Sequence, residues 1–394
     1  MFEGEIYMYG IVIGASDEAI YAIKKAQSKG ITVLAFDGDE HAAGLQYADE
    51  AFVVDIRDVN NIIKVIDEKG IQPKDMFVLP VPIGRYLIST GAFNEHYGLL
   101  GPTFKTTELC TDKWLFHETM AKSRLRNIWC KLLKEGETLD TIDHYPVIVK
   151  PRYGAGSREV LTLSNEDDFK AFKNRLPFDE DFIVEDEVSG CEYGIDGMVM
   201  DGEFQLILAR KKLITPPPYR QCVGYLSLKK SDEKNAIIKD YMTKLVSAIG
   251  LHTGVLHADL MLNEDGPFVI EMSARPSGHR LHNLFTPIVT GIDMISDYID
   301  FAEHKKIERP NKTDDANVYL IRYFDIESEI KRVPDKEYIM KKYSPLEYEC
   351  HLNVGEKVKI KDGHSLMSRG FFILKGDSEE EITQKANDIL REYY

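Results

Sequence analysis

Residues 257–278 decide the fold of this chain, and they read HADLMLNEDGPFVIEMSARPSG. The stretch predicts a β-hairpin, because two apolar runs (259–262 and 268–271) flank an Asn-Glu-Asp-Gly turn whose glycine tolerates positive φ. Each strand carries one acid, Asp259 or Glu271, and antiparallel pairing can bring the two side chains together. Adjacent carboxylates in an apolar hairpin are costly unless a cation neutralises them. Mg²⁺ is the natural candidate, because it prefers carboxylate oxygens and keeps waters and phosphates in its other positions.

An arginine follows this hairpin. Arg275 lies four residues beyond Glu271, and its planar guanidinium suits phosphate or carboxylate oxyanions. Acid-bearing hairpins are also common on protein surfaces, where the acids are solvated and the arginine pairs with one of them. The hairpin alone therefore leaves a solvated surface turn open as an alternative.

Composition limits the class of protein. The chain has 394 residues, 43% of them hydrophobic, which supplies core material for two or three domains. Its net charge of −16 disfavours a nucleic-acid or membrane-binding surface. The five cysteines are widely spaced, which is typical of reduced thiols and suggests neither a zinc site nor a disulfide framework. With no signal peptide and no 18-residue apolar run, we expect a cytoplasmic protein.

The N-terminal part alternates strands and helices. Strands are expected at 11–14, 32–36, 51–55 and 76–80, and helices at 18–29 and 59–69. Such alternation predicts a parallel sheet flanked by helices, a small Rossmann-like domain. The turn Gly14-Ala15-Ser16 is not a full Gly-x-Gly-x-x-Gly and Asp37 only faintly matches a ribose-binding acid, so a dinucleotide site is the weaker interpretation.

The middle of the chain carries a lysine whose position indicates an anion-binding site. Lys150 ends the apolar run of a strand expected at 145–150, and the loop after it is rich in small residues. A buried lysine needs an anion, and such a loop lets backbone N–H groups wrap phosphate oxygens. The alternative is a surface loop with an incidental lysine.

Further elements are expected downstream of this loop. They are a strand at 182–184, a hairpin of 194–200 with 204–209, and a helix at 232–249 whose buried face would be Ile237, Tyr241, Leu245 and Ile249. Beyond about residue 305 strands follow, and the last helix starts with a capping box of Ser378 and Glu381.

Several of these motifs, taken in order, resemble the ATP-grasp superfamily over essentially the whole chain. They are Lys113, the 150–157 strand and loop, the 185–188 run, Glu192, and the Asp259…Glu271-x-Ser273-x-Arg275 hairpin. The resemblance is to its biotin carboxylase, carbamoyl-phosphate synthase and L-amino acid ligase types. It implies an α/β (α+β grasp) fold with a Rossmann-like pre-ATP-grasp domain (1–110), a two-subdomain ATP-grasp domain (111–305, lid about 120–187) and a small β-rich biotin carboxylase-like C-terminal domain (306–394).

The resemblance also implies a role for each motif, with ATP and two Mg²⁺ or Mn²⁺ ions as cofactors. Lys113 and Lys150 would hold phosphates. The residues expected to close over the γ-phosphate are Gly154, Gly156 and Ser157, and those expected at the adenosine are Glu185, the Val188 backbone and Glu192. Asp259 and Glu271 would bridge the metal ions. Ser273 stands where many relatives carry a metal-binding Asn, and Arg275 would stabilise the transferring phosphoryl group and the oxyanion. A solvated charge run is the alternative for the acids.

The activity that the resemblance implies is that of an ATP-dependent carboxylate–amine ligase, which forms an amide or peptide bond through an acyl phosphate. The resemblance also allows a homodimer. Amino-acid or dipeptide ligation is favoured over a purine-biosynthesis-type ligase using formate or bicarbonate. A non-catalytic ATP-binding regulatory protein and a nicotinamide oxidoreductase are alternatives of other classes.

Three loops have the composition of a recognition pocket: 80–85, 215–220 and 278–280. We expect them to converge, with Arg280, or failing that Arg85 or Arg220, binding a substrate carboxylate. Ordinary turn chemistry would explain the same prolines and glycines.

Overall fold

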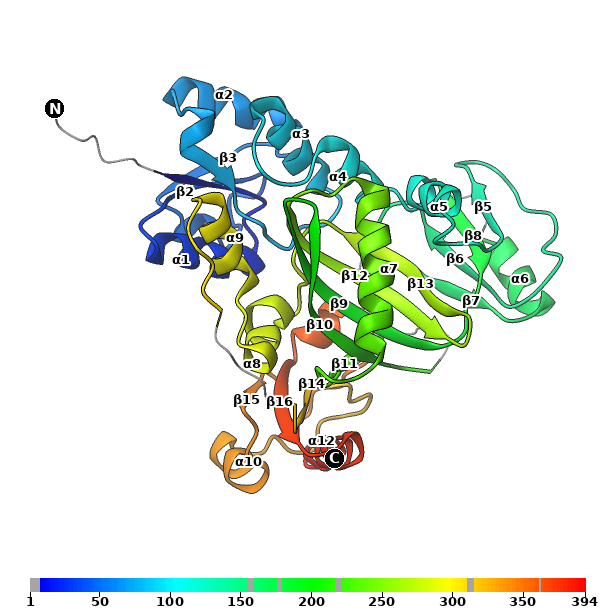
Figure 1. Ribbon diagram of the computed structural model, residues 1–394. Coiled ribbons are helices and arrows are strands. Elements are labelled where there is room, and N and C mark those ends of the chain that lie inside the picture. The colour runs from blue at the N-terminus through cyan, green and yellow to red at the C-terminus, as the bar shows by residue number, and fades with distance from the viewer. Residues whose placement is uncertain (1–7, 155–158, 176–178, 217–220, 310–314, 361–362) are drawn as a thin grey trace.

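The computed structural model describes residues 8–154, 159–175, 179–216, 221–309, 315–360 and 363–394. In these residues the chain forms three sheets of four, four and eight strands. Figure 1 shows the N-terminal sheet and a second small sheet on opposite sides of the large sheet, with the C-terminal elements at the bottom of the view.

The N-terminal sheet is parallel, with strand order β3-β2-β1-β4. Its strands are β1 (Tyr9–Ile13), β2 (Thr32–Asp37), β3 (Glu50–Val53) and β4 (Met76–Val78). Its helices are α1 (Ile20–Ser28), α2 (Val59–Lys69) and α3 (Leu87–Tyr97), and 3₁₀ turns lie at Asp17–Ala19 (η1), Leu45–Tyr47 (η2) and Pro73–Asp75 (η3). Because both faces of a parallel sheet are covered, β1, β2 and β4 are almost continuously apolar and buried, whereas the edge strand β3 is partly exposed. The predicted Rossmann-like unit is confirmed.

Two helices, α4 (Phe104–Thr111) and α5 (Lys113–Lys122), lead from this unit to the second small sheet. We call this sheet, with order β5-β8-β6-β7, the lid sheet. It consists of β5 (Cys130–Leu133), β6 (Val147–Pro151), β7 (Leu161–Leu163) and β8 (Phe182–Asp186), and α6 (Glu166–Lys173) packs on it. Asp112 caps α5 by accepting from the N–H groups of Trp114 and Leu115, which fixes the orientation of the helix that begins with Lys113.

The large sheet is antiparallel and runs β13-β12-β9-β10-β11-β14-β16-β15. Its strands are β9 (Cys191–Met200), β10 (Glu203–Ile214), β11 (Cys222–Ser227), β12 (Gly254–Asn263), β13 (Gly266–Ser273), β14 (Val318–Tyr323), β15 (Glu347–Cys350) and β16 (Gly370–Gly376). β11 pairs directly with β14, so the strands beyond residue 306 continue the large sheet rather than forming one of their own.

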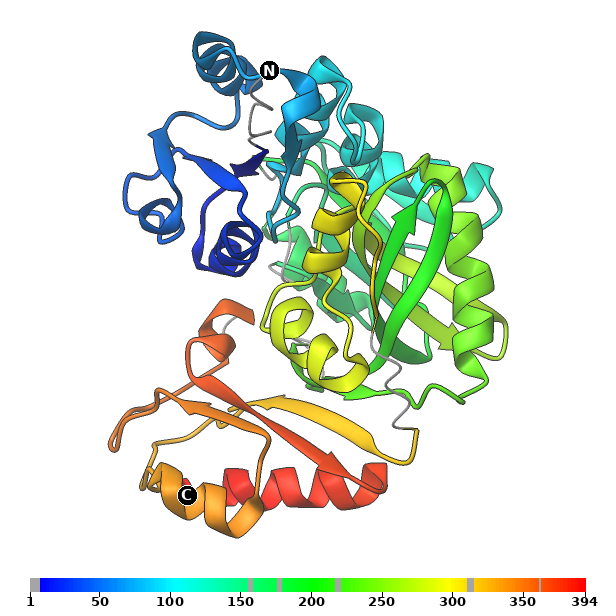
Figure 2. The same cartoon turned by 60° about the vertical axis from the view of Figure 1, so that its left-hand side comes forward.

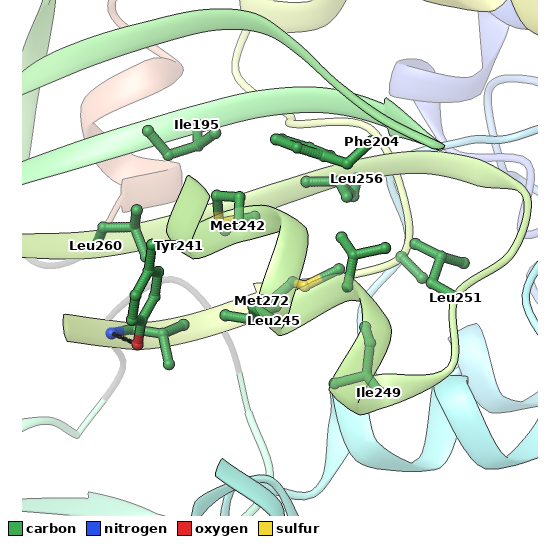
Figure 3. Close-up of a cluster of buried hydrophobic side chains, with 14 of the residues drawn as sticks. Ile195, Phe204, Tyr241, Met242, Leu245, Ile249, Leu251, Leu256, Leu260 and Met272 are labelled. Atoms are coloured by element: carbon green, nitrogen blue, oxygen red, sulfur yellow. Dashed lines mark hydrogen bonds between the residues drawn. The ribbon is translucent and has the colours of Figure 1, made fainter. Parts of the chain in front are cut away.

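One face of the large sheet is apolar and packs against α7 (Lys234–Ile249), as Figure 3 shows. The Tyr241 hydroxyl links the layers, since it accepts from the Val269 N–H at 3.0 Å and donates to the Leu125 carbonyl. The predicted apolar stripe was wrong at one position: Ile237 is 46% exposed, whereas Ile238 is fully buried. A fourfold spacing drifts by about 40° at each step of a helix with 3.6 residues per turn, so the buried face moves to a neighbouring position after three steps.

The remaining helices join and cover the sheets. They are α8 (Thr286–Thr290), α9 (Met294–Ala302), α10 (Lys336–Tyr343), α11 (Gly363–Met367) and α12 (Glu379–Arg391), with a π-helical turn at Leu281–Phe285 (η4). Figure 2 shows α12 along the C-terminal strands. The Ser378 hydroxyl accepts from the Glu381 N–H as predicted, while the Glu381 carboxylate accepts from the Asp377 N–H instead of completing the box at Ser378. Within the described residues, no helix combines the length and apolarity needed to cross a membrane.

Candidate active site

The face of the large sheet opposite α7 carries a group of charged and polar side chains. Side chains alternate along a strand, so positions two apart share a face. On this face lie Glu192 and Asp196 of β9, Arg210 and Lys212 of β10, His257 and Asp259 of β12, and Glu271 and Ser273 of β13. Asp259 pairs with Glu271 and His257 with Ser273, so the predicted proximity of the two acids is confirmed.

The cation that meets Asp259 is a lysine that sequence reasoning missed. Lys212 Nζ donates to Asp259 Oδ2 at 2.8 Å and also pairs with Glu192. We call these three residues the Lys212 cluster. Burial disfavours the charged ammonium, but Asp259 and Glu192 outweigh burial and hold the pKa of Lys212 well above its usual value. Burial likewise opposes ionisation of Asp259, and Lys212 with His257 outweighs it, so the pKa of Asp259 is lowered.

One oxygen of this cluster has no hydrogen-bond partner. Asp259 Oδ1 is buried and unpaired, with His257 Nε2 3.5 Å away. In the described residues no group of three or more His, Cys, Asp or Glu is arranged to hold a metal by itself. Two facing carboxylates with a spare oxygen nevertheless fit Mg²⁺, which is commonly held by one or two carboxylates together with substrate phosphates.

A first cavity lies between the large sheet and the lid sheet. Its lining combines charged groups (Lys113, Lys150, Glu185, Asp186, Glu187, Glu192, Lys212, Asp259, Glu271) with apolar ones (Ile148, Pro151, Val160, Val188, Met261, Phe268, Ile270) and Gly154. Six residues predicted to bind ATP thus lie around one space, together with both metal acids. The other two, Gly156 and Ser157, lie outside the described residues.

Lys150 meets an anion from the protein itself. It is 5% exposed, and its Nζ donates to Glu185 Oε1 at 2.6 Å, while Arg126 Nη2 donates to Glu185 Oε2 at 2.7 Å. Burial alone would raise the pKa of Glu185, but Lys150 and Arg126 outweigh it and lower that pKa. A carboxylate oxygen accepts more than one hydrogen bond, so the adenine role of Glu185 stays a prediction. Sequence reasoning missed Arg126, because it lies outside every motif and no local pattern predicts its pairing with Glu185.

Lys113 is a second lysine that lines this cavity, and it is half-buried. Its Nζ donates to the Gly154 carbonyl at 2.8 Å, which ties α5 to the loop after β6. Burial lowers the pKa of Lys113, and Glu271 counteracts this only in part. An anion placed between Lys113 and Lys150 would restore the balance, which suits a phosphate.

A second cavity adjoins the first, because Lys113, Gly154, Ile270 and Glu271 line both. Its other polar lining residues are Arg85, Thr111, His257, Ser273 and Arg275. Arg275 donates from Nη1 to the Pro276 carbonyl at 2.8 Å, and its Nε is buried without a partner. Burial lowers the pKa of Arg275 against the opposing effect of Glu271, so this guanidinium is short of anions.

The three arginines expected to bind a carboxylate have different places. Arg85 is exposed and lines the second cavity. Arg280 is exposed, has a positive φ of 61°, and is not among the residues described as lining either cavity. Arg220 lies outside the described residues. Of the loop predicted at 215–220, the described part is Thr215 and Pro216, which follow β10 directly. Of the described candidates, only Arg85 lines a cavity together with Glu271, one of the two acids predicted to bind metal.

Residues 143–282 match the protein family described as "ATP-grasp domain". Among curated proteins, the chain is 23% identical to dapdiamide A synthase of Enterobacter agglomerans over 195 residues, which covers 44% of each protein. It is 24% identical to phosphoribosylamine–glycine ligase of Methanopyrus kandleri over 425 aligned positions, covering 96% of this chain and 91% of that protein. The alignment to the first relative thus spans less than half of that relative's length.

The fold as a whole resembles a solved ligase. The L-amino acid ligase from Bacillus licheniformis superposes with a TM-score of 0.77 at 17% identity, covering 98% of this chain and 97% of that one. The predicted architecture and the resemblance to ATP-grasp proteins are therefore confirmed, while the role of each site residue stays a prediction.

Proposed function

We propose that this chain, whose residues 143–282 match the ATP-grasp domain family, is an ATP-dependent carboxylate–amine ligase that forms an amide or peptide bond and releases ADP and phosphate. The observation that carries the proposal is the pair of adjoining cavities. Glu271 and Lys113 line both, so a nucleotide in the first cavity would present its last phosphate to a carboxylate in the second.

The chemistry follows from this arrangement. A carboxylate oxygen attacks the γ-phosphorus, the bond to the β-phosphate oxygen breaks, and ADP leaves behind an acyl phosphate. An amine then attacks the acyl carbon and phosphate departs. No covalent enzyme intermediate is needed, so catalysis rests on positioning and charge stabilisation.

Five charged residues have a part in this scheme. Lys113 and Lys150 bind the phosphates, and Asp259 with Glu271 would hold Mg²⁺, which neutralises charge on the phosphates when bound. Arg275 lies on the side of the second cavity and has an unpaired buried Nε. It stabilises negative charge on the transferring phosphoryl group and on the oxyanion that forms when the amine attacks.

An amino-acid or peptide substrate class is supported by the whole-length likeness to an L-amino acid ligase. A second candidate is ligation of a phosphorylated amine, favoured by the match to a phosphoribosylamine–glycine ligase over 96% of the chain. A third cavity, at the carboxyl ends of the N-terminal strands where such sheets bind ligands, argues against it. Its lining holds Asp37, Asp39 and Asp55. Arg57 forms an ion pair with Asp55 at 2.6 Å, which leaves little positive charge to bind a phosphate.

Isotope transfer tests the proposal. The protein is incubated with ATP, Mg²⁺, pooled amines and pooled carboxylates labelled with ¹⁸O, and products and phosphate are analysed by mass spectrometry. We expect a condensation product and one ¹⁸O atom in the released phosphate. AMP formation, or label that never reaches phosphate, would contradict the acyl phosphate. ATP binding with no ADP in any pool would favour a regulatory ATP-binding protein.

A further inference from the structure

Lys212 occupies a position that the proposed reaction does not use. Its side chain is 9% exposed and lies between Asp259, assigned to the metal, and Glu192, assigned to the ribose. A single ammonium is thus shared by two carboxylates that belong to different parts of the ATP site.

The bond to Asp259 competes directly with a metal ion. Lys212 takes Asp259 Oδ2 and leaves only Oδ1 without a hydrogen bond, 3.5 Å from His257 Nε2. A divalent cation bound to the same carboxylate would lie a few ångströms from the ammonium, where two like charges repel strongly in a buried site. Binding of Mg²⁺ and binding of Lys212 to Asp259 therefore weaken each other.

The ammonium has another destination when a nucleotide is present. Lys212 lines the first cavity with Lys113 and Lys150, and its four-carbon stem is flexible with rotatable donors. Polyphosphate oxygens offer it a new anion, and Asp259, once the ammonium has left it, can bind the metal.

We propose that Lys212 is a built-in counter-ion of the metal site, which holds Asp259 and Glu192 until a nucleotide draws its ammonium to the phosphates, so that the metal enters with the nucleotide and not before. This inference rests on the proposed nucleotide and metal site, but not on the identity of the organic substrates or on turnover.

Metal binding to the full chain tests it, with Mn²⁺ as the probe and electron paramagnetic resonance to count free ions. We expect wild-type protein to bind Mn²⁺ at least tenfold more tightly with a non-hydrolysable ATP analogue, corrected for Mn²⁺ bound by the analogue itself. Lys212→Met should bind Mn²⁺ without nucleotide at least tenfold more tightly than wild type and bind the analogue more weakly.

The matched control is Lys211→Met. Lys211 is the next residue of β10, points to the other face and pairs with Glu379 at 2.5 Å, so its loss should change neither affinity. Equal Mn²⁺ affinities of wild type with and without the analogue would overturn the proposal even if Lys212→Met failed to fold. Unchanged or weaker nucleotide-free Mn²⁺ binding by folded Lys212→Met would overturn it too. Absence of Mn²⁺ binding under every condition would refute the metal site itself, and absence of ligation with these shifts present would refute only the proposed reaction.

Discussion

Two buried ion pairs on one face of the large sheet differ in how completely the aspartate of each pair is hydrogen-bonded. Arg210 and Lys212 are two residues apart on β10. Arg210 binds Asp196 through both terminal nitrogens, one at 2.9 Å, and Thr286 donates to the same carboxylate at 2.7 Å, with both ion-pair side chains 0% exposed. In the Lys212 cluster one ammonium serves two carboxylates and leaves Asp259 Oδ1 unpaired beside a cavity.

The difference separates a structural ion pair from an exchangeable one. A guanidinium fork matched to a carboxylate fixes geometry and leaves the carboxylate little capacity for a ligand. A lysine shared between two acids at a cavity wall can exchange its partners. We therefore expect changes at Asp196 to affect folding, and changes around Asp259 to affect ligand binding and turnover.

The largest effect is expected from breaking the structural pair. Asp196→Ala leaves the Arg210 charge buried and unpaired, and such losses cost about 3–5 kcal/mol of unfolding free energy. Urea denaturation measures this loss, and Lys212→Met is the comparison. We expect Lys212→Met to lose much less unfolding free energy, because the acids that Lys212 pairs with border a cavity. Asp196→Ala with Arg210→Met should recover part of the loss. Equal losses in the two single variants would remove the distinction between the pairs.

The next effect concerns turnover. Glu271→Gln removes one charge from the proposed metal site without breaking any ion pair described for Glu271, so stability should change little. Turnover should fall by a factor on the order of 10²–10³, the scale of losing one group that stabilises charge in the transition state. Phosphate release from ATP and substrates measures it. Glu264→Gln, in the exposed turn of the same hairpin, is the control, and wild-type turnover in Glu271→Gln at ordinary Mg²⁺ would refute the assignment.

The sequence predicted the hairpin acids because one short turn fixes their register. The pairing of Asp259 with Glu271 depends only on residues between them, so local rules suffice. The parallel N-terminal sheet was predictable for a similar reason, since alternating strands and helices leave few topologies. The pairing of β11 with β14 joins segments about ninety residues apart, and no local sequence pattern predicts it.

Lys212 was missed because of one irregularity. From the turn pair Glu203–Met200, regular pairing would place Lys211 opposite Glu192. A register shift between Leu206 and Leu208 instead pairs Lys211 with Tyr193 and turns Lys212 to the site. A one-residue shift exchanges the faces of a strand, and nothing in the sequence marks this bulge.

A smaller effect is expected from pH, close to the structural pair. Burial lowers the pKa of His282 to about 4, and its side chain is 1% exposed. The unfolded chain, with a histidine pKa near 6.5, binds the proton first, so this contribution is full above pH 6.5 and is lost as pH falls toward 4. It amounts to about 2 kcal/mol between pH 7 and pH 5. Urea unfolding should show a shallower pH dependence in His282→Gln, and the same slope as wild type in the exposed His304→Gln.

The smallest expected effect tests whether the exchangeable side of the site extends to the organic substrate. Arg85 borders the second cavity, and its only hydrogen bond described is a long one of 3.4 Å to the Tyr86 hydroxyl, so its guanidinium is available to a carboxylate. Arg280, the arginine favoured by the sequence, does not line either cavity as described. Arg85→Ala should raise the Michaelis constant for one organic substrate about tenfold, the equivalent of one charge-assisted hydrogen bond, and leave that for ATP unchanged. Arg280→Ala should change both less than twofold. If the two variants exchange these effects, the loop of residues 278–280 moves to the substrate during the reaction, and the second cavity is not where the carboxylate is recognised.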